Sequence, residues 1–280
     1  MKDDELTPGR RVLLRAAAML GLGASAGCAA DRAPAPGPAA AARTPAGGPQ
    51  AARLRGPSAY RLQPMAGYAP GRPGRALPRV REAPILRMPG REPTMVLTFD
   101  DGPDPRYTPH ILRTLREYEV RAMFFVCGEM AVDNKDLLRE MADDGHLIGN
   151  HTWSHPLLTR LHRAGMREEI ERTCEVIENA TGEPPAWFRA PYGAWNRNAF
   201  QLGAGLGMEP LAWTVDTLDW TEPGARTIVR RVREGAGPGV VVLSHDAGGD
   251  RSASVEALSS YLPELLDSGY HLTVPRSDLF

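Results

Sequence analysis

Cysteine is scarce in this chain of 280 residues, and its three thiols lie far apart, at Cys28, Cys127 and Cys174. So few cysteines exclude a disulfide scaffold, and their spacing fits neither a zinc ribbon nor a CxxC redox site. Cys127 and Cys174 are most simply small core side chains, although a bridge between them would be permitted after export.

Long apolar runs are lacking as well. The run over residues 16–24 is too short and too rich in Gly and Ala for a permanent membrane span. It follows Arg10-Arg11, and this order is typical of a bacterial export signal of the twin-arginine type. The run ends in Ser25-Ala26-Gly27-Cys28, which resembles a lipobox with serine in place of the usual leucine. Lipidation of Cys28 and ordinary cleavage nearby are the two alternatives. We therefore predict an export signal over residues 1–28. We expect an exported protein that is extracellular or anchored to the outer face of the cytoplasmic membrane or to the cell wall.

The chain as a whole has no surplus of charge, but its two parts differ. The formal net charge is −1, whereas residues 29–90 carry ten Arg, two acidic residues and twelve Pro. That composition predicts a disordered linker, which is either a solvated spacer or a basic segment that attracts anionic wall polymers or lipid headgroups. Residues 91–280 carry 19 basic and 29 acidic side chains and suffice for one sizeable folded domain. Because this part is acidic and has no basic-aromatic surface motif, we expect no nucleic-acid partner. We also expect a monomer.

Short apolar runs alternate with helix-like stretches after residue 91, a pattern typical of a parallel α/β sheet. The expected strands are 94–99, 122–126, 147–149, 187–189, 211–215, 240–243 and 271–274. The expected helices are 108–119, 135–144, 166–180, 196–207, 225–234 and 254–268. About seven parallel strands separated by helices predict an irregular (β/α) barrel, with a doubly wound open sheet as the alternative. No Gly-rich phosphate loop follows the first expected strand, which argues against nucleotide binding.

Two adjacent acids, Asp100 and Asp101, end the first apolar strand, where a cation or a proton would relieve their repulsion. His151 and His155 lie four positions apart, so one helical turn would aim both imidazoles at one point. One carboxylate and two imidazoles leave a fourth position open, as in a catalytic zinc site, and leave the second acid free to handle protons. The pattern predicts a metal-dependent hydrolase. Its structural alternatives are a turn with a helix cap for the acids and a surface loop for the histidines.

Other distinctive residues also follow expected strands: Arg189, Asp216, Asp219 and His245. Barrel enzymes assemble their sites at the C-terminal ends of the strands, so we expect these residues to meet the acid pair. Each alone also fits a structural role, such as stacking, capping or a satisfied core histidine. The histidines outside the motifs are assigned to that structural class: His110, His146, His162 and His271.

Five segments in order resemble the NodB-type polysaccharide deacetylases, carbohydrate esterase family four. These segments are Thr98–Pro103, His151–Pro156, Arg189–Gly193, Asp216–Trp220 and Leu243–His245. The resemblance covers residues 92–274 and implies an irregular (β/α) barrel with residues 91–280 as the catalytic domain. It also implies hydrolysis of N-acetyl groups from an amino-sugar polymer or oligomer, such as peptidoglycan or chitin fragments, with release of acetate. An N-acetylated glycan would then be the partner of the site.

The resemblance also implies the metal site. By the family's roles, Asp101, His151 and His155 would hold one divalent metal. Zinc is the first expectation, and cobalt or another ion is compatible with this O/N/N ligand set. Asp100 would be the general base, and Arg189 would pair with it and orient it.

The remaining roles that the resemblance implies concern the leaving group and the substrate. His245 would be the general acid, held as imidazolium by Asp219. The backbone N–H of Tyr192 would stabilise the oxyanion. Trp220 and Leu243 would form walls for the sugar and its methyl group.

Two other functions fit the same residues. A deacylase or amidohydrolase of another small amide would keep the metal site and change the substrate. A catalytically silent wall-binding barrel would keep the fold alone. The presence of base, ligands, arginine and acid together argues against the silent barrel.

Overall fold

Strand β1 (Thr94–Asp100) separates two layers of the core, because its side chains alternate between the faces of the sheet. In the computed structural model, which describes residues 76–275, Leu97 and Phe99 belong to the cluster that packs against the helices. Val96 belongs to a second cluster inside the barrel. The inner row of β1 ends in Asp100, so the strand delivers this carboxylate to the interior at its C-terminal end.

Within the described residues, one parallel sheet has the strand order β5-β4-β3-β2-β1-β7-β6, and β8 pairs with the start of β1. The other strands are β2 (Met123–Val126), β3 (Leu147–Asn150), β4 (Trp187–Phe188), β5 (Glu209–Pro210), β6 (Val215–Asp216), β7 (Val240–His245) and β8 (His271–Leu272). Strands far apart in the sequence, β1 and β7, therefore lie side by side at the centre.

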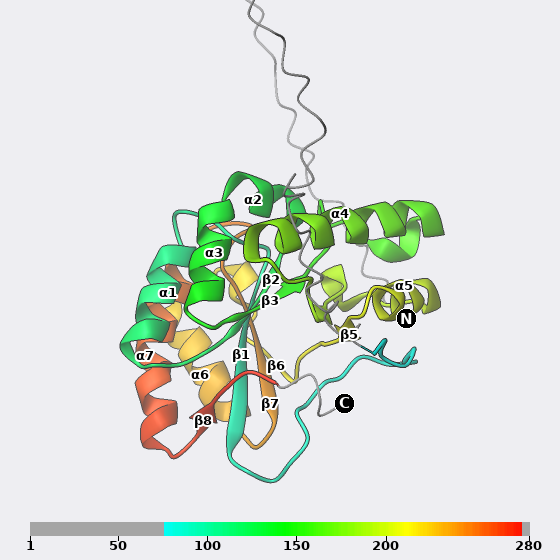
Figure 1. The fold of residues 1–280 in the computed structure, drawn as a ribbon. Helices are drawn as coiled ribbons and strands as arrows, with labels where there is room; N and C mark the ends of the chain where they lie inside the picture. The colour runs from blue at the N-terminus through cyan, green and yellow to red at the C-terminus, as the bar shows by residue number, and fades with distance from the viewer. Residues whose placement is uncertain (1–75, 276–280) are drawn as a thin grey trace, which may run out of the picture. The chain divides into compact units, whose positions relative to one another are not determined.

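Helices surround the strands (Figure 1). They are α1 (Thr108–Glu117), α2 (Gly128–Asp133), α3 (Lys135–Asp143), α4 (Arg163–Thr181), α5 (Arg197–Gly205), α6 (Ala225–Gly235) and α7 (Ser252–Asp267). Three short 3₁₀ helices are η1 (Leu158–Arg160), η2 (Pro191–Gly193) and η3 (Asp219–Thr221). The long α4 begins after His162, whose Nδ1 accepts the N–H of Gly165, and ends at Gly182 in the left-handed conformation (φ 80°).

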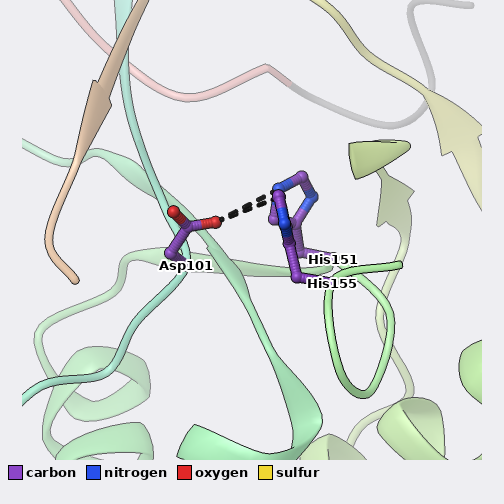
Figure 2. Close-up of side chains that lie close together, drawn as sticks. All are labelled: Asp101, His151 and His155. Atoms are coloured by element: carbon purple, nitrogen blue, oxygen red, sulfur yellow. Dashed lines mark ion pairs between the residues drawn. The ribbon is translucent and has the colours of Figure 1, made fainter. Parts of the chain in front are cut away.

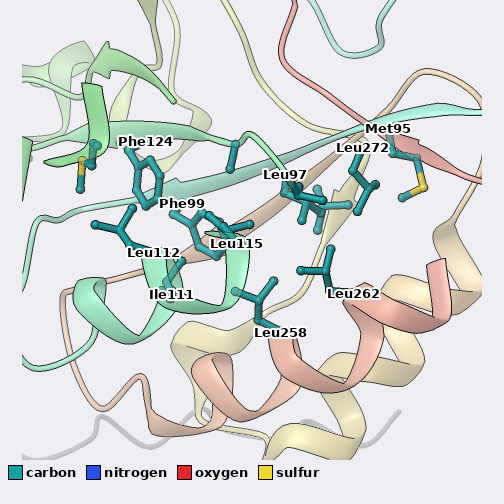
Figure 3. Close-up of a cluster of buried hydrophobic side chains, with 14 of the residues drawn as sticks. Met95, Leu97, Phe99, Ile111, Leu112, Leu115, Phe124, Leu258, Leu262 and Leu272 are labelled. Carbon is teal, nitrogen blue, oxygen red and sulfur yellow. The ribbon is translucent and has the colours of Figure 1, made fainter. Parts of the chain in front are cut away.

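The largest apolar cluster lies between the sheet and α1, α6 and α7 (Figure 3). Phe99 of β1 stacks on Phe124 of β2, with ring centroids 5.2 Å apart. Leu112 and Leu115 of α1 and Leu258 of α7 pack beneath them. Burial of each such side chain contributes roughly 1.5–3 kcal/mol, and this layer fixes the helices against the strands.

The crossover from β5 to β6 joins the two edges of the sheet. The sequence predicted one strand over residues 211–215, but β5 and β6 lie at opposite ends of the strand order. The five Cα steps from Pro210 to Val215 span at most about 17 Å, so the sheet must curl until its edges approach. Leu211 extends the pairing of β5 with β4, because its N–H donates to the carbonyl of Phe188. Thr214, in contrast, donates its N–H to a carbonyl of β7. The predicted irregular barrel of parallel strands is confirmed, rather than the open sheet.

A segment before β1 packs between these edges. Ile85 donates its N–H to the carbonyl of Pro210, and Ile85 and Met88 are each only 8% exposed within the inner cluster. Arg81 lies 2.6 Å from the carboxylate of buried Glu209. The prediction that the linker runs to residue 90 therefore places its end too late. Two apolar side chains, Ile85 and Met88, are enough to dock this Pro- and Arg-rich stretch on the barrel.

The predicted export signal, Cys28 and the linker up to residue 75 lie outside the described residues. Among residues 76–275, no helix combines the length and the apolar character needed to cross a membrane. Cys127 and Cys174 are both free thiols, and burial raises the pKa of each above its ordinary value.

We expect Ile85→Ala to lower the free energy of unfolding by about 2–4 kcal/mol, because it leaves a cavity in the inner cluster. Leu86→Ala is the matched control, since Leu86 is 51% exposed and its loss should cost less than about 0.5 kcal/mol. Urea unfolding followed by tryptophan fluorescence measures both. Equal values for the two variants would show that this segment does not belong to the folded domain.

Candidate active site

The acid pair lies where β1 leaves the sheet. Asp100 is 2% exposed, and Asp101 follows it in the left-handed backbone conformation (φ 77°). Asp101 donates its N–H to the carbonyl of Phe125 on β2, and the carbonyl of Asp100 accepts the N–H of Asp246 after β7. Both neighbouring strands thus fix the main chain here. The turn at Asp101 lets two consecutive carboxylates line the same pocket.

His151 and His155 do not share a helical turn, and that prediction is wrong. They belong to an irregular loop after β3, in which Thr152 (φ 72°) and His155 (φ 55°) are left-handed. Thr152 donates its N–H to the side chain of the last residue of β3, and the next two amides donate to Glu169 of α4. Side-chain acceptors replace helical bonds here because Pro156 disfavours the α conformation at the residue before it.

The loop nevertheless brings both imidazoles to Asp101 (Figure 2). Oδ1 of Asp101 lies 3.5 Å from Nε2 of His151 and 3.4 Å from Nε2 of His155. Nδ1 of His151 lies 2.8 Å from the carbonyl oxygen of Arg189, so Nδ1 carries the proton and Nε2 presents a lone pair. Burial lowers the pKa of His151 to about 3, and the ring is neutral.

A divalent cation fits these three residues. Oδ1 of Asp101 is buried and has no hydrogen-bond partner among the described residues, although it faces the lone pair of His151. Two such acceptors repel each other unless a cation lies between them. Donors about 2.1 Å from a tetrahedral ion are about 3.4 Å apart, which agrees with both measured separations.

Asp100 is held by a buried guanidinium. Arg189, which follows β4 and is 0% exposed, donates Nη1 to Oδ1 of Asp100 at 2.6 Å and to the hydroxyl of Thr98 at 2.8 Å. Its Nε and Nη2 donate to two carbonyls of the crossover after β5. Burial raises the pKa of Asp100 above its ordinary value, and the charge of Arg189 opposes that rise. Oδ2 of Asp100 lies 3.6 Å from Nε2 of His151, so the carboxylate also faces the metal-site residues.

His245, at the end of β7, pairs with Asp219 of η3. Nδ1 of His245 lies 2.6 Å from Oδ1 of Asp219, and Oδ2 accepts the N–H of His245 and the hydroxyl of Ser254. Burial alone would lower the pKa of His245, but the Asp219 carboxylate raises it to about 9. Burial would raise the pKa of Asp219, yet these bonds hold it below its ordinary value. The pair is therefore an imidazolium and a carboxylate at neutral pH.

A pocket of about 430 Å³ joins these groups, within the range typical of small-molecule sites. Most of the predicted site residues line it: Asp100, Asp101, His151, His155, Tyr192, Trp220, Leu243 and His245. Arg189 and Asp219 contact lining residues instead. Trp220 is 55% exposed, and the ring of Tyr192 meets that of His155 edge-on, with centroids 4.6 Å apart.

The structure adds two residues that sequence reasoning missed. Buried Asp246 accepts the N–H of Gly102 and the hydroxyl of Thr108, and burial raises its pKa to about 7. It fixes the turn after Asp101, and its position directly after His245 is the signal that points to it. Arg251 is 2% exposed and donates to main-chain carbonyls of the loop after β7 and of Asp219. No local pattern marks Arg251.

Residues 87–211 match a family model described as polysaccharide deacetylase. The chain is 36% identical over 204 residues to a chitooligosaccharide deacetylase of Rhizobium leguminosarum bv. trifolii, covering 69% of this chain and 95% of that protein. It is 38% identical over 176 residues to a peptidoglycan-N-acetylglucosamine deacetylase of Bacillus cereus. That match covers 62% of this chain and 64% of the relative, so the chain spans slightly less than two thirds of it.

Solved structures show the same fold. The Bc1960 peptidoglycan N-acetylglucosamine deacetylase superposes with a TM-score of 0.67 at 36% identity, over 71% of this chain and 92% of that one. A family-four pseudoenzyme from Bacillus anthracis superposes with a TM-score of 0.64 at 30% identity, over 68% of this chain and 66% of that one.

Fold and site together define a curled (β/α) barrel of parallel strands that carries a candidate metal site and other polar residues at the C-terminal ends of the strands. The chain belongs to the polysaccharide deacetylase family, carbohydrate esterase family four. That family implies a divalent metal, for which Asp101, His151 and His155 form the candidate site.

We expect Asp219→Asn to lower the pKa of His245 from about 9 toward its ordinary value of about 6.5, because the largest effect that opposes burial is removed, while the more distant Asp100 and Asp101 remain. NMR titration of the His245 ring in the metal-free protein measures the change. Asp216→Asn is the control for loss of a pocket charge without loss of the direct bond, since Asp216 lines the same pocket but accepts its hydrogen bond from the N–H of Leu218. Because the two charges interact only at a distance, this variant should lower the pKa of His245 less. A pKa that stays near 9 in Asp219→Asn would contradict this account of the imidazolium.

Proposed function

We propose that this chain hydrolyses N-acetyl groups from amino-sugar polymers or oligomers, peptidoglycan or chitin-like, in a metal-dependent reaction that releases acetate. One observation carries the proposal: the three donors of the metal site, the buried carboxylate of Asp100 and the imidazolium of His245 meet in one pocket. The names of the relatives, peptidoglycan and chitooligosaccharide deacetylases, support the substrate class.

Zinc is the proposed metal, because one carboxylate and two neutral imidazoles suit it, and cobalt is a compatible substitute. When bound by Asp101, His151 and His155, a divalent cation supplies Lewis-acid chemistry and lowers the pKa of water. The hydrogen bond from Nδ1 of His151 to the carbonyl of Arg189 fixes the tautomer in which Nε2 has a free lone pair for the metal.

Asp100 takes the proton of the attacking water. Its Oδ1 is occupied by the 2.6 Å bond from Arg189, so Oδ2, which faces the metal-site residues, is the oxygen that accepts the proton. His245 donates a proton from Nε2 to the leaving amine, because its Nδ1 is bound to Asp219. The two carriers thus start in opposite charge states, as an acid-base pair requires.

Substrate contacts are proposed for three residues. The backbone N–H of Tyr192, whose left-handed conformation (φ 60°) belongs to the turn η2, stabilises the oxyanion that forms on attack. Trp220 offers an exposed face on which a sugar ring stacks, and buried Leu243 packs against the acetyl methyl group.

The proposed location is outside the cytoplasm. The Arg10-Arg11 pattern and the apolar run behind it support export, and Cys28 is the proposed site of a lipid anchor. The protein is proposed to act as a monomer on an N-acetylated glycan.

Acetate release from acetylated glucosamine oligomers tests the activity. We expect release from the purified chain, loss of release with a chelator such as EDTA, and recovery on addition of zinc. Release that persists after complete metal removal would contradict metal dependence. Metal binding with no release from any glycan would favour an amidohydrolase of another small amide, and the lack of both would favour a silent barrel.

His245→Ala and His151→Ala should separate acid catalysis from metal binding. We expect His245→Ala to retain the metal and to lose about 10² or more in turnover, because the leaving amine goes unprotonated. His151→Ala should lose metal and activity together, since one of three protein ligands is removed. Metal content by mass spectrometry and acetate release, measured on the same samples, distinguish the two. Full turnover by His245→Ala would refute its assignment as the acid.

A further inference from the structure

The loop that carries both imidazoles lacks the support of regular structure. His151 leaves β3 buried and tied to Arg189, but His155 lies at the far end of the loop, and its side chain is 28% exposed. Two residues of the loop that are not glycine, Thr152 and His155, adopt the left-handed conformation. Such a backbone persists only where its surroundings impose it. The position of His155 relative to Asp101 therefore depends on the contacts that neighbouring elements make with the loop.

Glu169 of α4 holds the loop from one side by hydrogen bonds. Its Oε2 accepts the N–H groups of Trp153, at 2.9 Å, and of Ser154, at 2.8 Å, while its Oε1 accepts the hydroxyl of Ser154 at 2.9 Å. Both oxygens of one carboxylate are thus used on two consecutive residues that lie between the two histidines. Hydrogen bonds to an ionised acceptor are the stronger kind, and three of them converge here.

The N-terminus of α2 forms hydrogen bonds with the loop from the other side. Gly128 and Glu129 donate their N–H groups to the carbonyls of Thr152 and Trp153, at 2.9 and 3.2 Å. A Cβ on Gly128 would lie 2.4 Å from the Trp153 ring, so only glycine permits this approach. The guanidinium carbon of Arg172 lies 3.8 Å from the centre of the Trp153 ring. Between the histidines, therefore, the loop is clamped by α2 and α4.

We propose that Glu169 is a positioning residue of the metal site, which sets the affinity of Asp101, His151 and His155 for the cation by holding the loop between the two histidines. The proposal rests on the proposed function, because it assumes that these three residues bind a divalent metal. Glu169 touches none of the three proposed ligands through its carboxylate. Its effect is transmitted through the main chain of residues 153 and 154.

Zinc affinity, measured by competition with a chromophoric chelator, tests this role without reference to turnover. We expect Glu169→Ala to bind zinc about 10- to 100-fold more weakly than the wild-type chain, the usual result of removing a group that orients a ligand. Glu168→Ala is the matched control, because Glu168 is the exposed neighbour on α4 and carries the same charge. Its affinity should equal that of the wild type.

A conservative variant separates positioning from loss of structure. Glu169→Gln keeps one oxygen that can accept both amides, so it should recover most of the affinity that Glu169→Ala loses. Near-ultraviolet circular dichroism of the metal-free proteins checks that each variant is folded. If Glu169→Ala is unfolded, Glu169→Asp takes its place, with the carboxylate withdrawn by one methylene and a loss of affinity again expected.

Equal zinc affinity of Glu168→Ala and the folded alanine or aspartate variant at position 169 would overturn the positioning role. Absence of zinc binding by the wild-type chain would instead count against the proposed function as a whole, so the two failures are distinguishable.

Discussion

The buried ion pair of Arg189 and Asp100 is the interaction on which both the barrel and its site depend. Neither side chain is exposed beyond 3%, and loss of one partner would strand the other charge, at a cost of about 3–5 kcal/mol. The same guanidinium binds two carbonyls of the crossover that brings the sheet edges together. The carbonyl of Arg189 also holds the Nδ1 proton of His151. The guanidinium of Arg189 thereby ties the crossover to the barrel and fixes the carboxylate of Asp100, and its carbonyl sets the tautomer of a proposed ligand. The point charge of a lysine could not replace the guanidinium.

A second buried pair mirrors the first with the charges exchanged. Asp219 is the anion behind the pocket wall, and His245 is the cation that lines it, whereas Arg189 is the cation behind Asp100. Each rear partner is immobilised by further bonds: Asp219 by Ser254 and a main-chain amide, and Arg189 by carbonyls. Each of the two pocket-facing groups therefore has a fixed partner of opposite charge before any substrate arrives. In the proposed reaction, this arrangement supplies electrostatic preorganisation, in which the dipoles need no rearrangement as charge develops.

Sequence patterns predicted most of the barrel and of the candidate site because the patterns that mark them lie within single strands and the residues that follow them. Buried strands that end in a carboxylate or a histidine reveal both the element and the face of the barrel on which its last residue lies, as β1 and β7 show. The failures lie where tertiary contacts decide. The apolar stretch at 211–215 is a crossover rather than one strand, because Leu211 bonds to β4 on one side of the sheet, whereas Val215 pairs with β7 on the other. The loop from His151 to His155 escapes helical form because Glu169, an ordinary-looking helix residue, supplies acceptors from a distance. Ile85 docks although it lies in a stretch rich in proline and arginine.

Membership of the family does not by itself establish turnover, since a structure described as a pseudoenzyme superposes on this chain about as well as one described as a deacetylase. In the proposed function, activity therefore depends on the side chains in the pocket rather than on the barrel. The same side chains bear on selectivity. Tyr192 and Trp220 stand exposed at the pocket with Trp213 beside them, and aromatic faces fix the plane of a sugar ring without reading its individual hydroxyl groups. In the proposed reaction, the placement of the acetamide between Asp100 and His245 then decides which bond is hydrolysed, and the neighbouring sugars contribute mainly residence time on the aromatic surface.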